Sequence, residues 1–181
     1  MNELNPAGLT IIPYVCIEEE CLGLNQLKNG KCMDTEYNLL FSKPQIQDAL
    51  CTLLKTDDYK LIDLECKVIN DEDIRCWTIC SDPESETKTC KIILSIDDVN
   101  ENEGAILWIP NSQRINTIPT NESFKTSYFT DKNTGKIYPM KKRFATSKGG
   151  DMIAIHPYCW YSLGLNTSGK DTRYLVATYS S

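Results

Sequence analysis

The sequence has very little histidine, because His156 carries the single imidazole among its 181 residues. Acid–base catalysis, activated serine or cysteine nucleophiles and many transition-metal sites depend on imidazole groups. The nearby Cys159 follows three residues later, so on a strand its side chain points to the opposite face from His156. A nucleophilic dyad is therefore not expected, and one imidazole cannot supply a site that needs two.

The sequence also lacks a surplus of basic residues, a long apolar run and a phosphate-binding glycine loop. Its net charge of −6 disfavours nucleic acid as a partner, and the basic cluster at residues 141–143 is expected to be a solvated loop. Gly149 and Gly150 precede a predicted strand instead of opening a helix. No run is long enough to cross a bilayer, and residues 1–8 show no leader-like pattern. We therefore expect an intracellular, cytoplasmic protein without membrane insertion.

Cysteine is plentiful, but its spacing is not that of a metal or disulfide framework. There are nine cysteines, an odd number, and none stands in a Cys-x-x-Cys pair. The closest spacings are Cys76 with Cys80 and Cys16 with Cys21. Most of these residues are expected to act as small buried apolar groups.

Two helices are predicted near the N-terminus. Residues 18–27 place leucines at helical spacing. In the second helix Ser42 is the predicted N-cap and Pro44 lies in the first turn. Its apolar residues fall on one face, at Ile46, Ala49, Leu50, Leu53 and Leu54.

The rest of the chain is dominated by short strands. Apolar or alternating runs predict strands at residues 9–15, 61–69, 74–80, 89–96, 105–109, 152–155 and 174–179. A polar turn at residues 97–104 contains Asp97 and Asp98, which are expected to be solvated. This order predicts a mainly β protein with N-terminal helices (α+β), built as a sandwich or jelly roll. We expect one domain over 1–181, with a strand and helical layer at 1–58 and the β core at 59–181.

Three segments carry a family resemblance. Residues 9–21 read LTIIPYVCIEEEC, residues 94–114 read LSIDDVNENEGAILWIPNSQR, and residues 148–173 read KGGDMIAIHPYCWYSLGLNTSGKDTR. In this order they resemble the phytanoyl-CoA dioxygenase family of Fe(II)- and 2-oxoglutarate-dependent oxygenases. In the middle segment Glu103, Asn111 and Gln113 stand where the family has asparagine, glycine and histidine. The resemblance implies a double-stranded β-helix, a jelly-roll barrel whose mouth holds iron and 2-oxoglutarate.

The resemblance also indicates which positions would bind the iron, and none of them carries a family ligand. The family uses two histidines and one carboxylate as a facial triad. Residues 76–82 place Thr78 at the first histidine and Cys80 at the carboxylate. A register shifted to Asp82 restores a carboxylate but no histidine. The second histidine is expected five residues after a His-Pro dipeptide, which is Tyr161, so His156 itself matches a non-ligand histidine.

A positive residue at the expected offset suggests a remnant of the 2-oxoglutarate site. Arg173 lies twelve residues after Tyr161, where the family has an arginine that pairs with a carboxylate of 2-oxoglutarate. The sequence predicts either anion binding by Arg173 or a structural role, in which Arg173 pairs with an internal acid or caps the barrel mouth. Tyr158, Trp160 and Tyr161 are candidates for a filled pocket, an aromatic contact surface or plain core packing.

Three functions follow from these positions. The first is a catalytically inactive module of the dioxygenase fold that binds protein partners, as a scaffold or as a subunit of a larger assembly, without Fe(II) or 2-oxoglutarate. The second is a diverged oxygenase with a rebuilt metal site, for instance from Cys80, Tyr161 and His156. The third is a carrier or sensor that holds a small carboxylate through Arg173. The sequence favours the first and predicts no catalytic or metal-binding residue.

Overall fold

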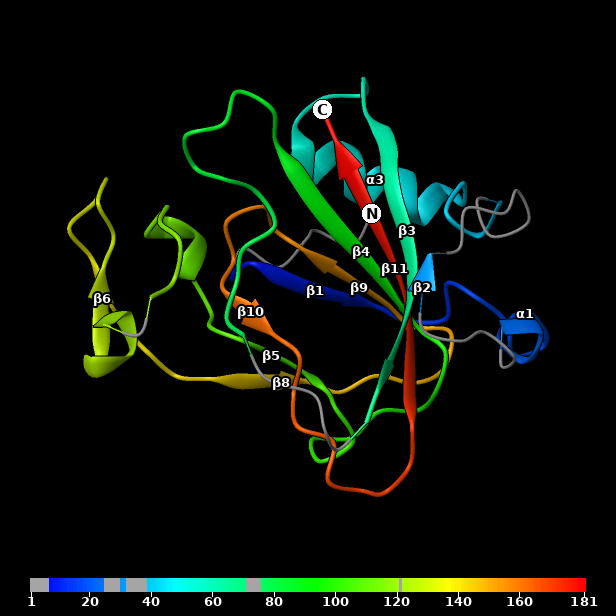
Figure 1. Ribbon diagram of the computed structural model, residues 1–181. Helices are drawn as coiled ribbons and strands as arrows, with labels where there is room; N and C mark the ends of the chain where they lie inside the picture. The colour runs from blue at the N-terminus through cyan, green and yellow to red at the C-terminus, as the bar shows by residue number, and fades with distance from the viewer. Residues whose placement is uncertain (1–6, 25–29, 32–38, 71–75, 121) are drawn as a thin grey trace.

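The computed structural model describes residues 7–24, 30–31, 39–70, 76–120 and 122–181, and its β structure forms two antiparallel sheets and a separate hairpin (Figure 1). The large sheet has the order β1-β9-β4-β11-β3-β2 and the small sheet the order β10-β5-β8. The large sheet comprises β1 (Leu9–Ile12), β2 (Gly30–Lys31), β3 (Lys60–Ile69), β4 (Thr89–Ser95), β9 (Met152–Ile155) and β11 (Thr172–Ser180). The others are β5 (Ile106–Trp108), β8 (Arg143–Ala145) and β10 (Tyr161–Ser162), with β6 (Tyr128–Thr130) and β7 (Ile137–Pro139) in the hairpin.

The central strands of the large sheet, β4, β9 and β11, are buried on both faces. On β4, Ile92 and Leu94 belong to the core that packs against the helices, whereas Ile93 faces the small sheet. A strand covered on both sides is expected to read as a continuous apolar run, and residues 92–94 do so. The barrel interior therefore lies between the two sheets, and a second core lies on the helix side. This arrangement confirms the predicted jelly roll with a helical layer.

The helices α1 (Glu18–Leu24) and α3 (Pro44–Leu54) pack against the large sheet. The 3-10 helices η1 (Ser112–Arg114) and η2 (Glu122–Lys125) lie between β5 and β6 along the chain. The buried face of α3 is the one predicted from spacing, comprising Ile46, Ala49, Leu50, Leu53 and Leu54. None of the described helices is long and apolar enough to cross a membrane.

The predicted N-cap of α3 was wrong by one residue. Lys43 holds the extended N-cap conformation and makes no side-chain cap, while the hydroxyl of Ser42 donates to the carbonyl oxygen of Leu39 at 2.8 Å. The Lys43 ammonium instead donates to Glu20 of α1 at 2.6 Å and to the carbonyl oxygen of Val15 at 2.8 Å. The side chain at the N-cap thus connects the two helices.

Most of the predicted strands are confirmed, but the one predicted at residues 74–80 is not a strand in its described part. Residues 74 and 75 lie outside the described residues, and from 76 onward the segment makes a single antiparallel bridge, Thr78 with Tyr161. Both Cys80 and Ser81 then donate their backbone N–H to the carbonyl oxygen of Pro157, at 2.9 and 3.0 Å. Because two successive N–H groups share one acceptor, the ladder cannot continue beyond this point.

Candidate functional site

The three positions predicted from the family motif to correspond to metal ligands lie close together beside the barrel interior. Thr78 donates its backbone N–H to the carbonyl oxygen of Tyr161 at 2.9 Å, and the Tyr161 N–H donates back to Thr78 at 3.0 Å. Cys80 follows on the same segment, and its side chain is hydrogen bonded to that of Tyr161. The backbone therefore retains the convergence of these positions, although their side chains differ from a facial triad.

The side chains at these positions are uncharged at neutral pH. Burial raises the pKa of the Cys80 thiol to about 11, and burial also raises the pKa of the Tyr161 phenol. The Thr78 side chain is exposed and its hydroxyl donates to the carbonyl oxygen of Ile79 at 3.1 Å. Because a thiolate, not a thiol, binds metal, the set offers a hydroxyl, a protonated thiol and a phenol. This donor set does not fit the family's Fe(II) ion.

A cavity of about 270 Å³ opens beside these residues, between the large and small sheets. Its buried walls include Ile93 of β4, Val176 of β11 and Tyr161, while the exposed Cys76 and Thr78 lie at its rim. Two basic residues also line it, Lys67 of β3 and Lys91 of β4. The sequence-based reasoning missed both lysines. Each stands at a strand position whose side chain faces the barrel interior, but the sequence alone does not show which face of the strand that is.

His156 does not line this cavity. The imidazole Nδ1 accepts the backbone N–H of Tyr158 at 3.3 Å, and the backbone N–H of His156 donates to the carbonyl oxygen of Gly8 at 3.0 Å. Burial lowers the pKa of the imidazole to about 4, so the ring is neutral at pH 7. A rebuilt metal site from Cys80, Tyr161 and His156 has no support in this geometry. Over the described ranges, no group of three or more His, Cys, Asp or Glu side chains is arranged to hold a metal ion.

Arg173 lies on the other face of the large sheet. On β11 the side chains of Tyr174 and Val176 face the barrel interior, whereas Leu175 and Ala177 face the helices. Arg173 shares the phase of Leu175, because side chains alternate along a strand. The Arg173 Nε donates to Asp97 Oδ2 at 3.0 Å, and its backbone N–H donates to the same oxygen at 2.8 Å. Arg173 therefore pairs with an acid of the protein, which is one of the roles predicted for it.

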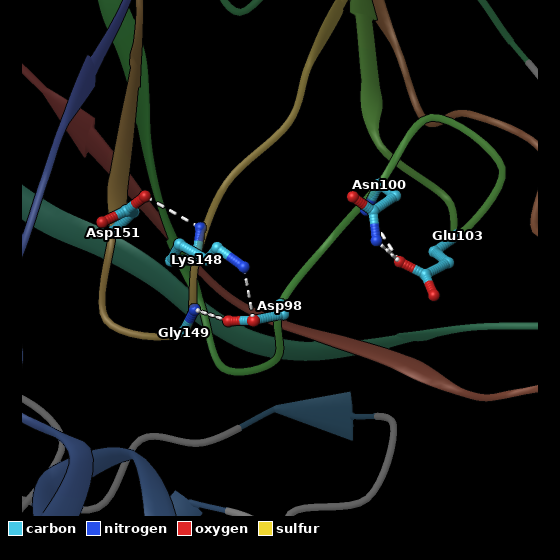
Figure 2. A network of polar contacts seen from close by, with 6 residues as sticks. All are labelled: Asp98, Asn100, Glu103, Lys148, Gly149 and Asp151. Atoms are coloured by element: carbon cyan, nitrogen blue, oxygen red, sulfur yellow. Dashed lines mark hydrogen bonds and ion pairs between the residues drawn. The ribbon is translucent and has the colours of Figure 1, made fainter.

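In the acidic turn at residues 97–104, Asp98 is exposed as predicted and Asp97 is about one quarter exposed, and the acids of the turn bind back to the protein (Figure 2). Asp98 accepts the Lys148 ammonium at 2.8 Å and the Gly149 N–H at 2.9 Å. Glu103 accepts the backbone N–H of Asn100 at 2.8 Å and thereby closes the turn. With Asp97 held by Arg173, this turn is a structural connection and not a carboxylate pair poised for catalysis.

Of the three aromatic residues named near the barrel mouth, Trp160 and Tyr161 are core residues and Tyr158 is half-buried. Trp160 is 2% exposed and Tyr161 is 6% exposed, so neither can form an exterior contact surface. The indole N–H of Trp160 donates to the carbonyl oxygen of Thr117 at 2.8 Å, and its backbone N–H donates to the buried Ser112 hydroxyl at 2.8 Å. Asp82, the carboxylate of the shifted register, accepts the Glu84 N–H at 2.9 Å in an exposed turn.

The two sheets, their helical layer and the position of the cavity define the class of double-stranded β-helix proteins to which 2-oxoglutarate oxygenases belong. A profile of the phytanoyl-CoA dioxygenase (PhyH) family matches residues 18–174. The chain therefore belongs to the phytanoyl-CoA dioxygenase family. A search of curated proteins gave no match.

Solved structures of similar fold cover almost the whole chain. HygX from Streptomyces hygroscopicus with iron bound superimposes with a TM-score of 0.76 at 11% identity, covering 96% of this chain and 82% of that one. EvdO2 from Micromonospora carbonacea var. aurantiaca complexed with 2-oxoglutarate gives 0.71 at 13% identity, covering 97% and 87%. SnoN, a non-heme alpha-ketoglutarate-dependent epimerase from nogalamycin biosynthesis, gives 0.69 at 14% identity, covering 96% and 78%. At such low identity these similarities establish the fold alone.

Proposed function

We propose that this protein is a non-oxygenase member of its family and acts as a binding or scaffolding module within a protein assembly. The observation that supports this most directly is the donor set at the converging positions. A hydroxyl, a protonated thiol and a phenol at Thr78, Cys80 and Tyr161 offer Fe(II) none of the imidazole or carboxylate ligands that the fold normally supplies. Without bound iron, 2-oxoglutarate has no metal to chelate and the family reaction does not start.

A projecting hairpin with a surplus of positive charge favours a protein as the partner. The segment at residues 125–143, here called the basic arm, carries six basic residues and one acid, Asp131, in a chain whose net charge is −6. In Figure 1 the β6 end of this arm extends away from the two sheets. The arm's Asp131 is buried and bound to Arg114 at 3.3 Å, so it does not offset the exposed positive charge.

The two faces of the β6–β7 hairpin differ in their contacts. Phe129 and Tyr138 pair across the strands, stack at 5.6 Å between ring centres, and pack with the aromatic cluster around Trp160. The opposite face presents Tyr128 and Ile137, which are 57% and 64% exposed. This apolar face has lysines around it, so it suits a protein segment that carries acidic side chains and at least one apolar side chain. We propose that such a segment binds to the basic arm.

The absence of oxygenase chemistry is tested by metal loading. The purified chain would be incubated anaerobically with Fe(II), desalted and assayed for iron, and then assayed for succinate release from 2-oxoglutarate. We expect iron at the level of a non-binding control protein and no succinate. One tightly bound equivalent of iron, or turnover of 2-oxoglutarate, would overturn the proposal.

The basic arm is tested with synthetic acidic peptides that each contain one aromatic or aliphatic anchor. Binding is expected to weaken when Lys132 and Lys141 are both changed to Glu, and when Ile137 is changed to Ser. The matched control changes Lys55 and Lys60, both exposed and outside the arm, to Glu. Equal loss in the control and the arm variants, or no binding to any peptide, would remove the arm as the docking surface.

A further inference from the structure

The loop that follows β1 presents two large apolar side chains at the surface. Residues 13–20 read PYVCIEEE, and this segment is here called the Tyr14 loop. Tyr14 is 78% exposed and Ile17 is 59% exposed, whereas the two residues between them are buried. Three acids follow Ile17, of which Glu19 is exposed, and the loop contains no basic residue. Exposed apolar side chains beside charge of one sign are typical of a protein contact surface.

The protein holds Tyr14 in an uncommon backbone conformation. Its φ is 56°, in the left-handed region that bulky residues rarely adopt. The Tyr14 N–H donates to Asp151 Oδ1 at 3.1 Å, and the other carboxylate oxygen of the buried Asp151 accepts the Lys148 N–H at 2.8 Å. The Cys16 N–H donates to the carbonyl oxygen of Gly150 at 3.0 Å. The loop is thus fixed from both sides of Val15, so a contact through Tyr14 costs little ordering on binding.

The charges around the Tyr14 loop favour a basic partner. Two lysines contact the loop or its supporting segment, and each is already bound to an acid: Lys43 to Glu20 at 2.6 Å, and Lys148 to Asp98 at 2.8 Å. The exposed Glu19 adds negative charge to these matched pairs. A partner that brings lysines and an apolar face would therefore meet complementary charge here.

The basic arm of the same chain has this composition. The arm contains six of the 19 basic residues and one of the 25 acids, so the rest of the chain has 13 basic residues and 24 acids. Tyr128 and Ile137 of the arm and Tyr14 and Ile17 of the loop give each surface one exposed aromatic and one exposed aliphatic side chain. In Figure 1 the β6 end of the arm and α1, which begins within the Tyr14 loop, lie at opposite ends of the molecule. The two surfaces therefore do not meet within one molecule, but they can meet between two copies.

From this complementarity we propose that the basic arm of one copy binds the Tyr14 loop of a second copy, so that the chain associates head to tail. The inference rests on the proposed role of the arm as a docking surface and names its partner. Tyr128 and Ile137 pack against Tyr14 and Ile17, while the lysines of the arm face the acids of the loop. Because the contact joins two different surfaces, each added copy leaves one arm and one loop available, and the assembly grows into a ring or an open chain.

The test is sedimentation velocity of the intact chain over a range of protein and salt concentrations. We expect association that increases with protein concentration, continues beyond a dimer and weakens with added salt, which screens the charges. Tyr14→Asn removes the ring and should fold at least as well, because asparagine tolerates the left-handed conformation. Tyr14→Asn alone, and Lys132→Glu with Lys141→Glu in the arm, should each weaken association by about tenfold or more, the loss expected for an interface anchor.

Mixing the two variants separates a head-to-tail contact from a symmetric one. The Tyr14 variant keeps its arm and the arm variant keeps its loop, so an equimolar mixture should form a heterodimer that grows no further. A contact between two identical surfaces would not be restored by mixing. Ile62→Ser is the control, because Ile62 is 45% exposed on β3 and outside both surfaces, and it should associate like the unchanged chain. Circular dichroism establishes that each variant is folded, and Ile17→Ser replaces Tyr14→Asn if the latter is not.

A chain that stays monomeric at every concentration, variants that associate like the unchanged chain, or a mixture without heterodimer would overturn the head-to-tail contact. If the arm still binds acidic peptides in that case, only the partner named here is wrong and the docking role of the arm stands. If the arm binds no peptide either, the docking role fails as well. The iron assay is independent of both results.

Discussion

The backbones of Thr78 and Tyr161 exchange a reciprocal pair of hydrogen bonds, which places their side chains at the mouth of the same cavity. These residues come from segments far apart in the chain. The bridge holds in register the two positions that the family motif predicts for histidine ligands, although neither carries a histidine. The third position, Cys80, contacts Tyr161 through its thiol. The three positions that the family motif predicts for metal ligands thus lie close together, with other side chains in place.

Restoring the family side chains should therefore create an iron site. We expect the triple variant Thr78→His, Cys80→Asp and Tyr161→His to bind one equivalent of Fe(II) anaerobically, because two imidazoles and a carboxylate would then converge. Iron content after desalting, together with the spectrum of a Co(II)-substituted sample, measures this. The single variant Tyr161→His is the control and should bind no iron tightly. A folded triple variant that also binds none would show that these three positions do not match the triad.

Asp97 and Arg173 should contribute to stability and not to ligand binding. Each side chain is about one quarter exposed, and Arg173 binds Asp97 through both its side chain and its backbone N–H. A double-mutant cycle with Asp97→Asn and Arg173→Met, followed by urea unfolding, should give a coupling of about 1–2 kcal/mol. The cycle for Asp98 and Lys148, on the same turn, should give a smaller coupling because both side chains are mostly exposed. Equal coupling in the two cycles would contradict this ranking.

The single histidine should make folding stability sensitive to mild acid. The imidazole has a pKa of about 4 in the folded protein and about 6.5 in the unfolded chain, so the unfolded chain takes up the proton first. Stability should be full above pH 6.5 and should fall by up to roughly 3 kcal/mol as pH decreases towards 4. NMR titration needs no assignment, because only His156 contributes imidazole signals. A His156→Gln variant should lose this part of the pH dependence, and a measured pKa near 6.5 would refute the account.

Gly150 should be far less replaceable than Gly135. Both have positive φ, 90° at Gly150 and 70° at Gly135. A Cβ added to Gly150 would overlap the carbonyl oxygen of Cys16, whereas a Cβ added to Gly135 would have no atom within 4 Å. Gly135→Ala should cost about 1 kcal/mol for the backbone conformation alone, and Gly150→Ala clearly more. Chemical denaturation of both variants measures the difference. Similar losses would mean that the Gly150 loop moves away from Cys16 at little cost.

The spacing of apolar residues is sufficient to predict those helices and strands that bury only one face. The buried face of α3 was predicted in full, because the spacing from Ile46 to Leu54 matches one side of a helix. The alternation in β3 was likewise readable. The hairpin β6–β7 was not predicted, because its strands are three residues long and only Phe129 is buried in them. With so few buried positions, neither strand carries a periodic signal.

The candidate site was predictable only in part, because position along a strand decides which face a side chain reaches. Thr78, Cys80 and Tyr161 were placed by motif, and the structure brings them together. Arg173 was placed at a plausible offset, yet one residue of difference moves a side chain to the other face of a sheet. Lys91 was overlooked because no family motif points to it, and its neighbours only became evident once β4 was paired with β9 and β11.

The double burial of the large sheet has a consequence for how this interior could change over evolution. The helix-side core, which contains Leu50, Leu64 and Ile92, lies on the face of the sheet away from the cavity. We therefore expect substitutions at the mouth of the barrel to disturb this core little. A core placed behind the sheet in this way lets the residues at the barrel mouth change during evolution while the fold is retained.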